Sequence, residues 1–333
     1  MASRPSHVEI GNGSGPGKTR QSLAIQAMGL GVAFGDVEVL REVDLEIRQG
    51  QVFGLIGPSG CGKTTFLRLA GGLAVPTEGA LRVFDEAPRN FGPRQQARLG
   101  YVPQQFALYG NLSVEQNARF VAGLYGMGWR HRRRRIRELL EYYDLWSVRK
   151  RRASDISGGM LRRLSIACAV MHQPDLVLID EPTTGLDPLL RTKVWEHLKN
   201  VRDGGATVLV TTQYIDEALN CDRIAVMRAG SIIAVGHPDD VRKMAGGQEA
   251  LEMKVTGLTP AVVDRLWSIR PVSRVKWNER DELIVLTSDS AAATPLVTNE
   301  LRAHGVEVHE VRAYIPTFED AFLTLMQSRK DER

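Results

Sequence analysis

Cysteine is scarce in this chain, and long apolar runs are absent from it. The 333 residues include three cysteines, Cys61, Cys168 and Cys221, which lie far apart and form neither a disulfide framework nor a zinc-binding spacing. We therefore expect a protein of the reducing cytosol. No stretch of about 18 consecutive apolar residues occurs, so we expect no membrane-spanning helix. The polar N-terminus also lacks the apolar core of a secretory signal.

A strong excess of one charge is missing as well. Lysine and arginine number 43 against 39 aspartates and glutamates, and the resulting net charge of +4 does not by itself argue for nucleic acid. The seven histidines follow no metal-binding pattern. The length allows one large domain with a small one, or two domains, and a sizeable core.

The most informative stretch is GPSGCGKT at residues 57–64, which matches the phosphate-binding pattern G-x-x-x-x-G-K-[ST]. A strand-like run at 51–56 precedes it and a helix-like run at 65–73 follows, which favours a nucleotide site over a glycine-rich turn with a chance Lys-Thr. The glycines let backbone N–H groups point at an anion beside a helix N-terminus. We expect Lys63 to reach the β- and γ-phosphates and Thr64 to ligate Mg²⁺. The residues of this stretch expected to bind ATP are Gly57, Pro58, Ser59, Gly60, Cys61, Gly62, Lys63, Thr64 and Thr65.

Two acidic residues, Asp180 and Glu181, follow the apolar run at 176–179. A buried strand there would place both at its carboxyl end, where open α/β sheets bind ligands. We expect Asp180 to hold Mg²⁺ through a water molecule and Glu181 to act as general base on the attacking water. The alternative is a strand that ends in a solvated acidic turn. The phosphate-binding loop favours the catalytic interpretation.

The stretch ISGGM at residues 156–160 precedes the acidic strand by about 20 residues. A lone Ser-Gly-Gly is a weak signal and often only caps a helix. In this order, however, the chain resembles the ATP-binding-cassette (ABC) ATPases, the motor subunits of ABC transporters, whose signature is Leu-Ser-Gly-Gly-Gln. Ser157, Gly158 and Gly159 match it, whereas Ile156 and Met160 depart from it. The resemblance implies that these residues contact the γ-phosphate bound by a second subunit.

The resemblance covers roughly residues 26–240. It implies that Phe34 stacks on adenine and that Gln104 contacts Mg²⁺ and the attacking water and couples the site to a membrane partner. It also implies that Asp187, in the loop that begins at Thr184, lies at the interface of a head-to-tail dimer.

Gln213 departs from the family, which usually places a histidine on the γ-phosphate. Glutamine donates a hydrogen bond but cannot titrate, so Glu181 stays the main candidate base. Gln213 and Gln104 are the other residues expected to take part in catalysis. The resemblance gives Mg²⁺ the ligands Thr64, Gln104 and Asp180. Glutamine at this position is similar to the daunorubicin-resistance group, whose subunits pair with a separate permease.

The pattern of elements predicts an α/β fold with a P-loop NTPase core over residues 25–245. Residues 24–47 indicate an antiparallel β subdomain, and the polar helical pattern over about 112–172 indicates an inserted helical subdomain. Residues 1–24 are typical of a flexible tail; their Gly-Lys-Thr at 17–19 lacks both the first glycine of the pattern and a preceding strand. Residues 244–248 resemble a linker. The order strand, helix, two strands, helix, strand and final helix over 250–327 predicts a small α+β domain of the ferredoxin-like kind.

Basic residues gather at 130–137, and 149–152 and Arg162–Arg163 follow. They are interpreted as a solvated helix face or as a contact with anionic lipid head groups; a nucleic-acid groove is least favoured, because no aromatic residues are interleaved.

The chain is thus expected to be an ATP-hydrolysing motor of a membrane exporter, at the cytoplasmic face of the membrane, with ATP and Mg²⁺ as cofactors. Two copies, or one copy and a paralogous ATPase, would close head to tail and drive a separately encoded permease, which would select a drug or another hydrophobic substrate. The alternative is a soluble ABC ATPase that acts on ribosomes or DNA; one uninterrupted cassette without heptads argues against it. Residues 250–327 are expected to serve regulation or dimer stabilisation.

Overall fold

The computed structural model describes residues 22–246, 249–278 and 282–314, and its contacts divide the chain into two compact units at His237–Pro238. The predicted linker at 244–248 therefore begins inside a helix, α7 (Pro238–Gly246). A proline in the first position and two acidic residues in the first turn favour this helix start. Of the predicted tail at 1–24, residues 1–21 lie outside the described residues.

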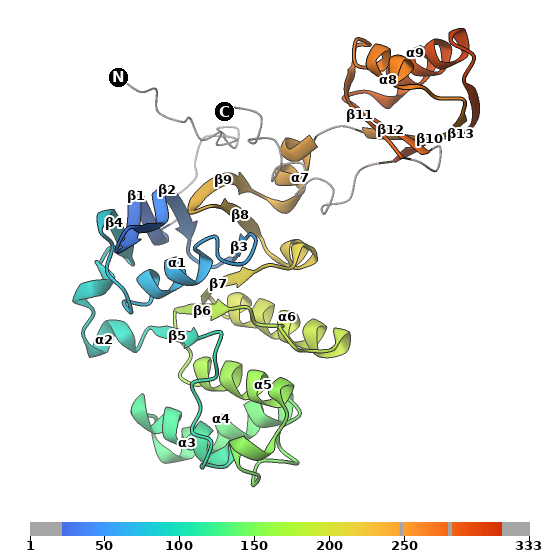
Figure 1. Cartoon of the computed structure of the whole chain (residues 1–333). Helices are drawn as coiled ribbons and strands as arrows, with labels where there is room; N and C mark the ends of the chain where they lie inside the picture. The colour runs from blue at the N-terminus through green and yellow to red at the C-terminus, as the bar shows by residue number, and fades with distance from the viewer. Residues whose placement is uncertain (1–21, 247–248, 279–281, 315–333) are drawn as a thin grey trace, which may run out of the picture. The chain divides into compact units, whose positions relative to one another are not determined.

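A six-stranded sheet forms the centre of the first unit (Figure 1). Its order is β5 (Leu99–Val102), β6 (Leu176–Asp180), β7 (Thr207–Thr212), β3 (Val52–Ile56), β8 (Arg223–Arg228) and β9 (Ser231–Gly236). All neighbours are parallel except β9, which is antiparallel to β8. Strands β3, β6 and β7 are buried along their whole length, as their continuous apolar runs require in a parallel sheet covered on both faces. Their carboxyl ends meet at one edge, which brings the motifs that follow them together.

A second, antiparallel sheet has the order β2 (Val37–Arg48), β1 (Leu23–Phe34) and β4 (Glu78–Val83). The turn between β1 and β2 falls at Gly35–Asp36, as predicted, and Gly35 has the left-handed φ of 59° that a tight turn needs. Helix α1 (Lys63–Ala70) packs between the two sheets, and its Phe66 and Leu67 are fully buried in their common core. The predicted antiparallel subdomain is confirmed; β4 and β9 are additional to the prediction.

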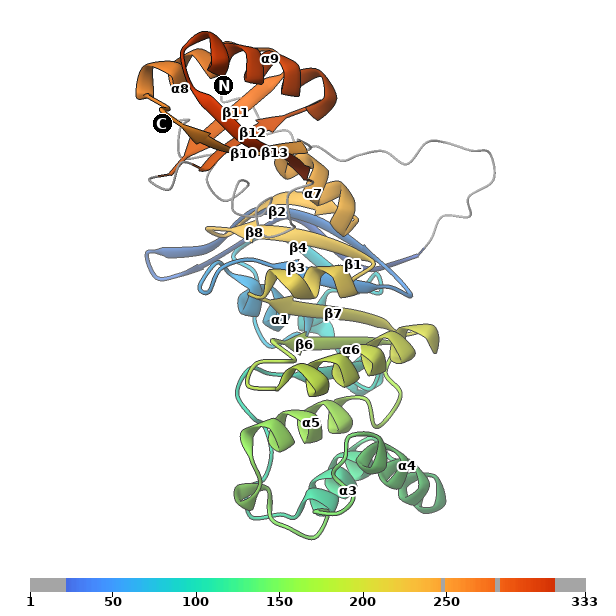
Figure 2. The same cartoon turned by 90° about the vertical axis from the view of Figure 1, so that its right-hand side faces the viewer.

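Helices α3 (Val114–Leu124), α4 (Trp129–Tyr142) and α5 (Gly158–Ala169) lie beyond the β5 edge of the six-stranded sheet (Figure 1). Figure 2 shows them on the side of β6 that faces away from β7. They form the predicted helical subdomain, while α6 (Pro188–Asp203) covers the sheet itself and a short α2 (Pro93–Gln96) precedes β5. One prediction for this region is wrong. Arg162 and Arg163 are 3% and 7% exposed, so they do not belong to a solvated basic face. Both guanidinium groups are buried and donate hydrogen bonds to backbone carbonyl oxygens.

The second unit holds a four-stranded antiparallel sheet in the order β11, β12, β10, β13. Its elements follow one another as β10 (Glu249–Thr256), α8 (Pro260–Leu266), β11 (Val272–Trp277), β12 (Glu282–Thr287), α9 (Ser290–Ala303) and β13 (Glu307–Tyr314). This is a split βαβ arrangement, with alternate residues of β10 and β12 packed against the helices. The predicted final helix at 317–327 lies outside the described residues. Within the described ranges, no helix is both long and apolar enough to cross a membrane.

Candidate nucleotide site

The loop between β3 and α1 is curled around the side chain of Lys63. The Lys63 Nζ donates hydrogen bonds to the carbonyl oxygens of Gly57 and Pro58, both at 2.8 Å. Gly60 and Gly62 have φ values of 77° and 110°, a conformation that favours glycine. Gly57 has no room for a side chain, because a Cβ atom there would lie 2.2 Å from the carbonyl oxygen of Met227. The fold therefore requires glycine where the sequence pattern places it.

A cavity of about 260 Å³ opens beside this loop. Its walls are Val39, Ser59, Gly60, Gly62, Lys63, Thr64, Thr65, Gln104 and Glu181. The cavity thus brings most of the phosphate-binding loop together with two of the predicted catalytic residues, which come from a distant part of the chain. Cys61 is buried and does not line the cavity; burial raises the pKa of its thiol, and the charge of Lys63 opposes that shift.

Asp180, at the end of β6, is held by two hydroxyl groups. Its Oδ2 accepts a hydrogen bond of 2.8 Å from Thr64 Oγ1, and its Oδ1 accepts one from Thr211 Oγ1. Asp180 is 1% exposed. Thr64 lines the cavity, and its hydroxyl and the Asp180 carboxylate joined to it are the hard oxygen donors that Mg²⁺ prefers. The residues present therefore fit the metal that the sequence pattern predicts.

Glu181 has an oriented carboxylate and an unusual backbone. Its Oε2 accepts hydrogen bonds from Gln104 Nε2 at 3.3 Å and from Thr184 Oγ1 at 3.1 Å. Its N–H donates to the carbonyl oxygen of Thr211 at 3.0 Å. The φ of 51° is left-handed for a residue with a long side chain, a form of strain that is concentrated at functional sites. The geometry aims the carboxylate into the cavity.

Arg162, on α5, is a residue of this site that the sequence interpretation missed. Its guanidinium donates to the carbonyl oxygens of Pro103 and Gln104, both at 2.9 Å, and at 3.4 Å to that of Asp180. Burial lowers the pKa of Arg162, while the carboxylates of Asp180 and Glu181 oppose that effect. Arg162 thus fixes the ends of β5 and β6, next to the predicted catalytic residues Gln104 and Glu181. The sequence feature that could have indicated a buried arginine is the pair Arg162–Arg163, which is followed by mostly apolar residues at 164–170.

The comparisons with known proteins point to one family. Residues 40–184 match the family model described as ABC transporter. The probable multidrug ABC transporter ATP-binding protein YbhF of Escherichia coli is 39% identical over 234 residues, which cover 70% of this chain and 40% of YbhF. The daunorubicin resistance ATP-binding protein DrrA3 of Streptomyces coeruleorubidus is 34% identical over 305 residues, 91% of this chain and 95% of DrrA3. This chain belongs to the ABC transporter ATP-binding subunits.

A solved structure confirms the predicted P-loop fold of this ABC subunit. The dimeric, post-hydrolysis ATP-binding cassette MJ0796, bound to ADP and Pi, aligns with a TM-score of 0.59 and 28% identity. The alignment covers 64% of this chain and 98% of MJ0796. The daunorubicin-resistance resemblance is likewise confirmed by the relatives found. The match to YbhF, in contrast, spans about two fifths of that protein's length.

Six predicted nucleotide contacts of this ABC subunit that lie outside the phosphate-binding loop do not line the cavity formed by the described residues. Ser157 is the N-cap of α5 and accepts a hydrogen bond from the Met160 N–H at 3.3 Å, and Gly158 and Gly159 open that helix. Asp187 caps α6 by accepting from the Leu190 N–H at 3.0 Å. The other two are Phe34, at the end of β1, and Gln213, directly after β7. Ser157, Gly158, Asp187, Phe34 and Gln213 are all exposed.

Proposed function

We propose that this chain hydrolyses ATP with Glu181 as general base and so powers export through a separately encoded permease. The observation that carries the proposal is the carboxylate of Glu181, held by Gln104 and Thr184 at the wall of the cavity that Lys63 lines. The names of YbhF, a probable multidrug transporter subunit, and of DrrA3, a daunorubicin resistance protein, support export of drugs or other hydrophobic molecules. The permease selects the substrate.

The loop at 57–64 binds the phosphates through its N–H groups and the N-terminus of α1. Lys63 exchanges its two carbonyl partners for phosphate oxygens and places its charge on them. Thr64, Asp180 and Gln104 would hold Mg²⁺, which when bound neutralises phosphate charge. Phe34, at the tip of the β1–β2 hairpin, offers its ring face to adenine.

Glu181 takes a proton from the attacking water and orients it. Gln104 and Thr184 fix the carboxylate for this role, and Gln213 donates a hydrogen bond without titrating. In this proposal Glu181 is the residue that takes up the proton. The rate of hydrolysis therefore depends on keeping the Glu181 carboxylate in place.

The exposed ends of α5 and α6 support a head-to-tail dimer. The N–H groups of Gly158 and Gly159, together with the Ser157 hydroxyl, form an anion-binding helix start away from the chain's own cavity. Asp187 lies at the start of the next helix. A second copy, or a paralogous ATPase, brings these groups to the γ-phosphate bound by the first copy. The dimeric state named for MJ0796 supports this arrangement.

An exposed aromatic surface next to Gln104 supports docking of the permease. Phe106, Tyr109 and Phe120 are 43%, 55% and 40% exposed, and the rings of Tyr109 and Phe120 meet edge to face at 4.9 Å. Exposed aromatic groups of this kind are typical of interfaces. Because the surface begins two residues after Gln104, a partner bound there reaches the site directly. The chain then works at the cytoplasmic face of the membrane.

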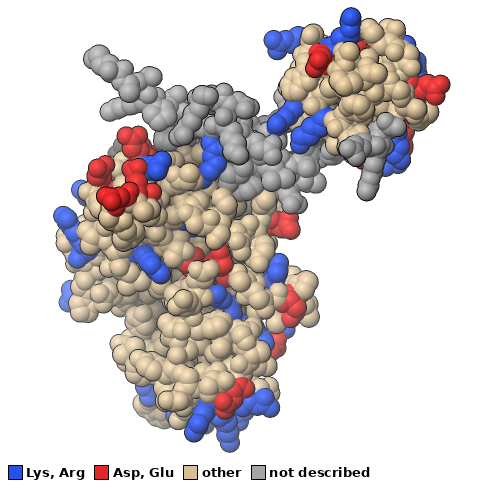
Figure 3. Space-filling model, viewed as in Figure 1, with Lys and Arg blue, Asp and Glu red and all other residues tan. Residues whose placement is uncertain are grey.

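The basic face of α4 lies at the end of the first unit (Figure 3). Arg134 and Arg137 form surface pairs with Glu138 and Glu141, whereas Arg130 and Arg133 have no acidic partner among the described residues. Anionic lipid head groups near this face would contribute about 1 kcal/mol per basic residue. No feature of the described residues favours ribosome or DNA binding.

The substitution Glu181→Gln tests the proposed base. We expect ATP turnover to fall by at least about 10²-fold, because general bases contribute at least that much, while ATP affinity stays unchanged. The exposed Glu141→Gln variant, which removes the same charge far from the cavity, is the matched control and should keep wild-type turnover. Normal hydrolysis by Glu181→Gln would contradict the assignment. Recovery of a polytopic membrane protein from detergent-solubilised membranes tests the permease, and recovery of ribosomes or DNA instead would favour the soluble alternative.

The segment 250–327 serves regulation or dimer stabilisation in this proposal. Its compact sheet, packed on α8 and α9, has a core of its own. Removal of the segment should change ATP-dependent dimerisation, ATPase activity or transport. Unchanged values of all three would contradict this role.

A further inference from the structure

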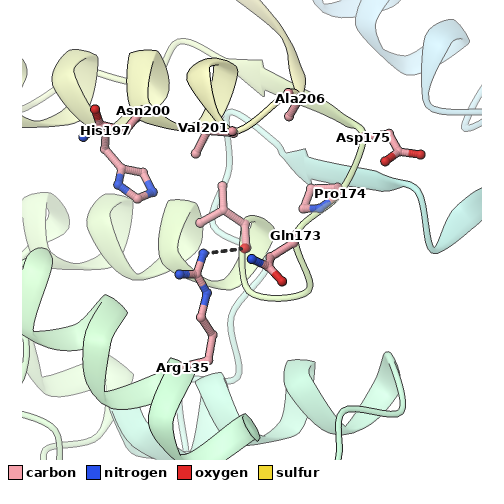
Figure 4. Close-up of a pocket in the computed structure, with 11 residues that line it drawn as sticks. Arg135, Gln173, Pro174, Asp175, His197, Asn200, Val201 and Ala206 are labelled. Carbon is pink, nitrogen blue, oxygen red and sulfur yellow. Dashed lines mark hydrogen bonds between the residues drawn. The ribbon is translucent and has the colours of Figure 1, made fainter. Parts of the chain in front are cut away.

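A second cavity, of about 390 Å³, lies in the first unit on the side of α6 that faces the helical subdomain (Figure 4). It is enclosed by α4, by the segment between α5 and β6, and by α6 with the turn that follows it. Its lining residues are Arg135, Val170, Gln173, Pro174, Asp175, His197, Asn200, Val201, Gly204, Gly205 and Ala206. The volume falls in the lower part of the range of small-molecule sites, roughly 300–1,000 Å³. None of these residues belongs to the nucleotide cavity.

Two polar side chains point into this cavity and have hydrogen-bonding capacity left. Arg135 makes only long contacts, from Nη2 to the Val170 carbonyl oxygen at 3.5 Å and from Nη1 to Glu138 Oε2 at 3.7 Å. Its Nε is buried and has no hydrogen-bond partner in the described ranges. His197, 8% exposed, has a buried Nε2 that is also without a partner among those residues. Buried donors of this kind are normally satisfied by a ligand or by water.

The imidazole of His197 is neutral and fixed in orientation. Burial, and then the nearby charge of Arg135, lower the pKa of His197 to about 4. The rings of Tyr142 and Tyr143 pack against it, with centroids 4.6 Å and 4.9 Å away. A neutral imidazole can still donate one hydrogen bond from Nε2.

Among the lining residues, Arg135 brings positive charge to the cavity; its ion pair is the 3.7 Å contact with Glu138. Asp175, the acidic residue of the lining, directs its carboxylate at Arg98 with an N–O distance of 2.5 Å, and Figure 4 shows it turned away from Arg135. The guanidinium of Arg135 is therefore not neutralised by this carboxylate. Carboxamide groups of Gln173 and Asn200 and apolar groups of Val201 complete the wall.

We propose that this cavity binds a small organic carboxylate. The planar fork of Arg135 matches the two oxygens of a carboxylate, and the N–H of His197 can reach the same group. The apolar walls formed by Val170, Pro174 and Val201 take a short hydrocarbon chain. A phosphate group fits less well, because its additional oxygens would face these apolar walls without donors.

Occupation of the cavity joins two parts of the fold. Arg135 belongs to the helical subdomain, whose α5 is capped by Ser157, whereas His197 belongs to α6 on the central sheet. A bound carboxylate therefore favours one position of the subdomain relative to the sheet. This regulatory consequence rests on the proposed ATP-driven dimerisation; the binding itself does not.

The test is a butyrate titration of the full-length chain, with histidine ring labels followed by NMR and the His197 signal assigned through His197→Gln. A bound carboxylate next to the imidazole should raise the pKa of His197 saturably, while 1-butanol, the uncharged analogue, should leave it unchanged. Arg135→Gln should weaken butyrate binding by about tenfold or more, and Arg135→Lys, which keeps charge but loses the fork, by less. Arg133→Gln, the same charge change on the exposed side of α4, should bind as the wild type does.

Three outcomes would overturn the proposal. They are no saturable response of His197 to butyrate, equal binding by the Arg135→Gln and Arg133→Gln variants, or tighter binding of inorganic phosphate than of butyrate. If Arg135→Gln fails to fold, the comparison of butyrate with 1-butanol on the wild-type chain still tests whether the cavity binds a carboxylate. A failed titration would leave the ATPase proposal intact, since that proposal is tested separately by Glu181→Gln.

Discussion

Replacement of Arg162 by lysine should slow ATP hydrolysis although Arg162 is no part of the cavity wall. Lysine keeps the positive charge but has a single Nζ in place of the planar fork whose two Nη groups reach the Pro103 and Gln104 carbonyl oxygens at 2.9 Å. The loss of at least one charge-assisted hydrogen bond costs about 1.5–3 kcal/mol. We therefore expect the free energy of unfolding to fall by about 2 kcal/mol.

The rate effect follows from the position of Gln104. When its carbonyl is released, its side chain no longer holds the Glu181 carboxylate at 3.3 Å, and misplacement of a catalytic group by about 1 Å can cost about 10²-fold in rate. We expect kcat to fall by about tenfold to 10²-fold, with little change in ATP affinity. Single-turnover hydrolysis measures the rate, equilibrium nucleotide binding measures the ATP affinity, and urea unfolding measures the free energy of unfolding.

Arg163 provides the matched control. It is the next residue of α5, is 7% exposed, and donates to the Tyr143 carbonyl oxygen at 2.5 Å, within the helical subdomain. Arg163→Lys should lower stability to a similar degree without lowering kcat, because it leaves Gln104 in place. If both variants reduce kcat equally, or if Arg162→Lys hydrolyses ATP at the wild-type rate, the positioning role of Arg162 is refuted.

Three further substitutions test other parts of the structure. Gly57→Ala should lower the free energy of unfolding by about 2 kcal/mol in urea unfolding, because its Cβ would lie 2.2 Å from the Met227 carbonyl oxygen, whereas Gly158→Ala, which meets no atom within 4 Å, should change it by less than about 0.5 kcal/mol. Asp180→Asn should raise the Mg²⁺ concentration for half-maximal hydrolysis by about 10–100-fold. His197 has a folded pKa of about 4, below its unfolded value of 6.5, so its folded form binds fewer protons and stability is lost as pH falls between these values. Relative to His197→Gln, the wild type should therefore lose about 3 kcal/mol of unfolding free energy from pH 6.5 to pH 4, measured by urea unfolding at each pH.

The sequence predicted the parts of the site whose residues are adjacent along the chain. The phosphate-binding loop and the pair Asp180–Glu181 each follow a buried strand, and parallel strands place their carboxyl ends at one edge of the sheet. The position of Glu181 near Lys63 follows from these two facts alone. The left-handed φ of Glu181 and the support from Thr184 do not, because they depend on backbone details of the loop.

Arg162 shows why the rest could not be predicted. Its partners, Pro103 and Gln104, are 59 and 58 residues away in the chain, and only the packing of α5 against β5 brings them within reach. A pattern of charge along the sequence cannot separate a buried arginine from the exposed ones at 130–137. Strands β4 and β9 were missed for a related reason. Each lies at the edge of a sheet and pairs with one neighbouring strand, β4 with β1 and β9 with β8, so its position depends on that pairing.

Gln104 connects Glu181, the proposed base, with the exposed aromatic surface. Its side chain donates to Glu181, its carbonyl accepts from Arg162, and that same guanidinium lies 5.3 Å from the ring centre of Phe106. A partner that displaces Phe106 therefore acts on the group that fixes Gln104. The bond from Gln104 to Glu181 is long for a hydrogen bond, at 3.3 Å, so a small displacement is sufficient to strengthen or break it. In the proposed function, hydrolysis and partner binding would therefore both depend on one segment, residues 103–106.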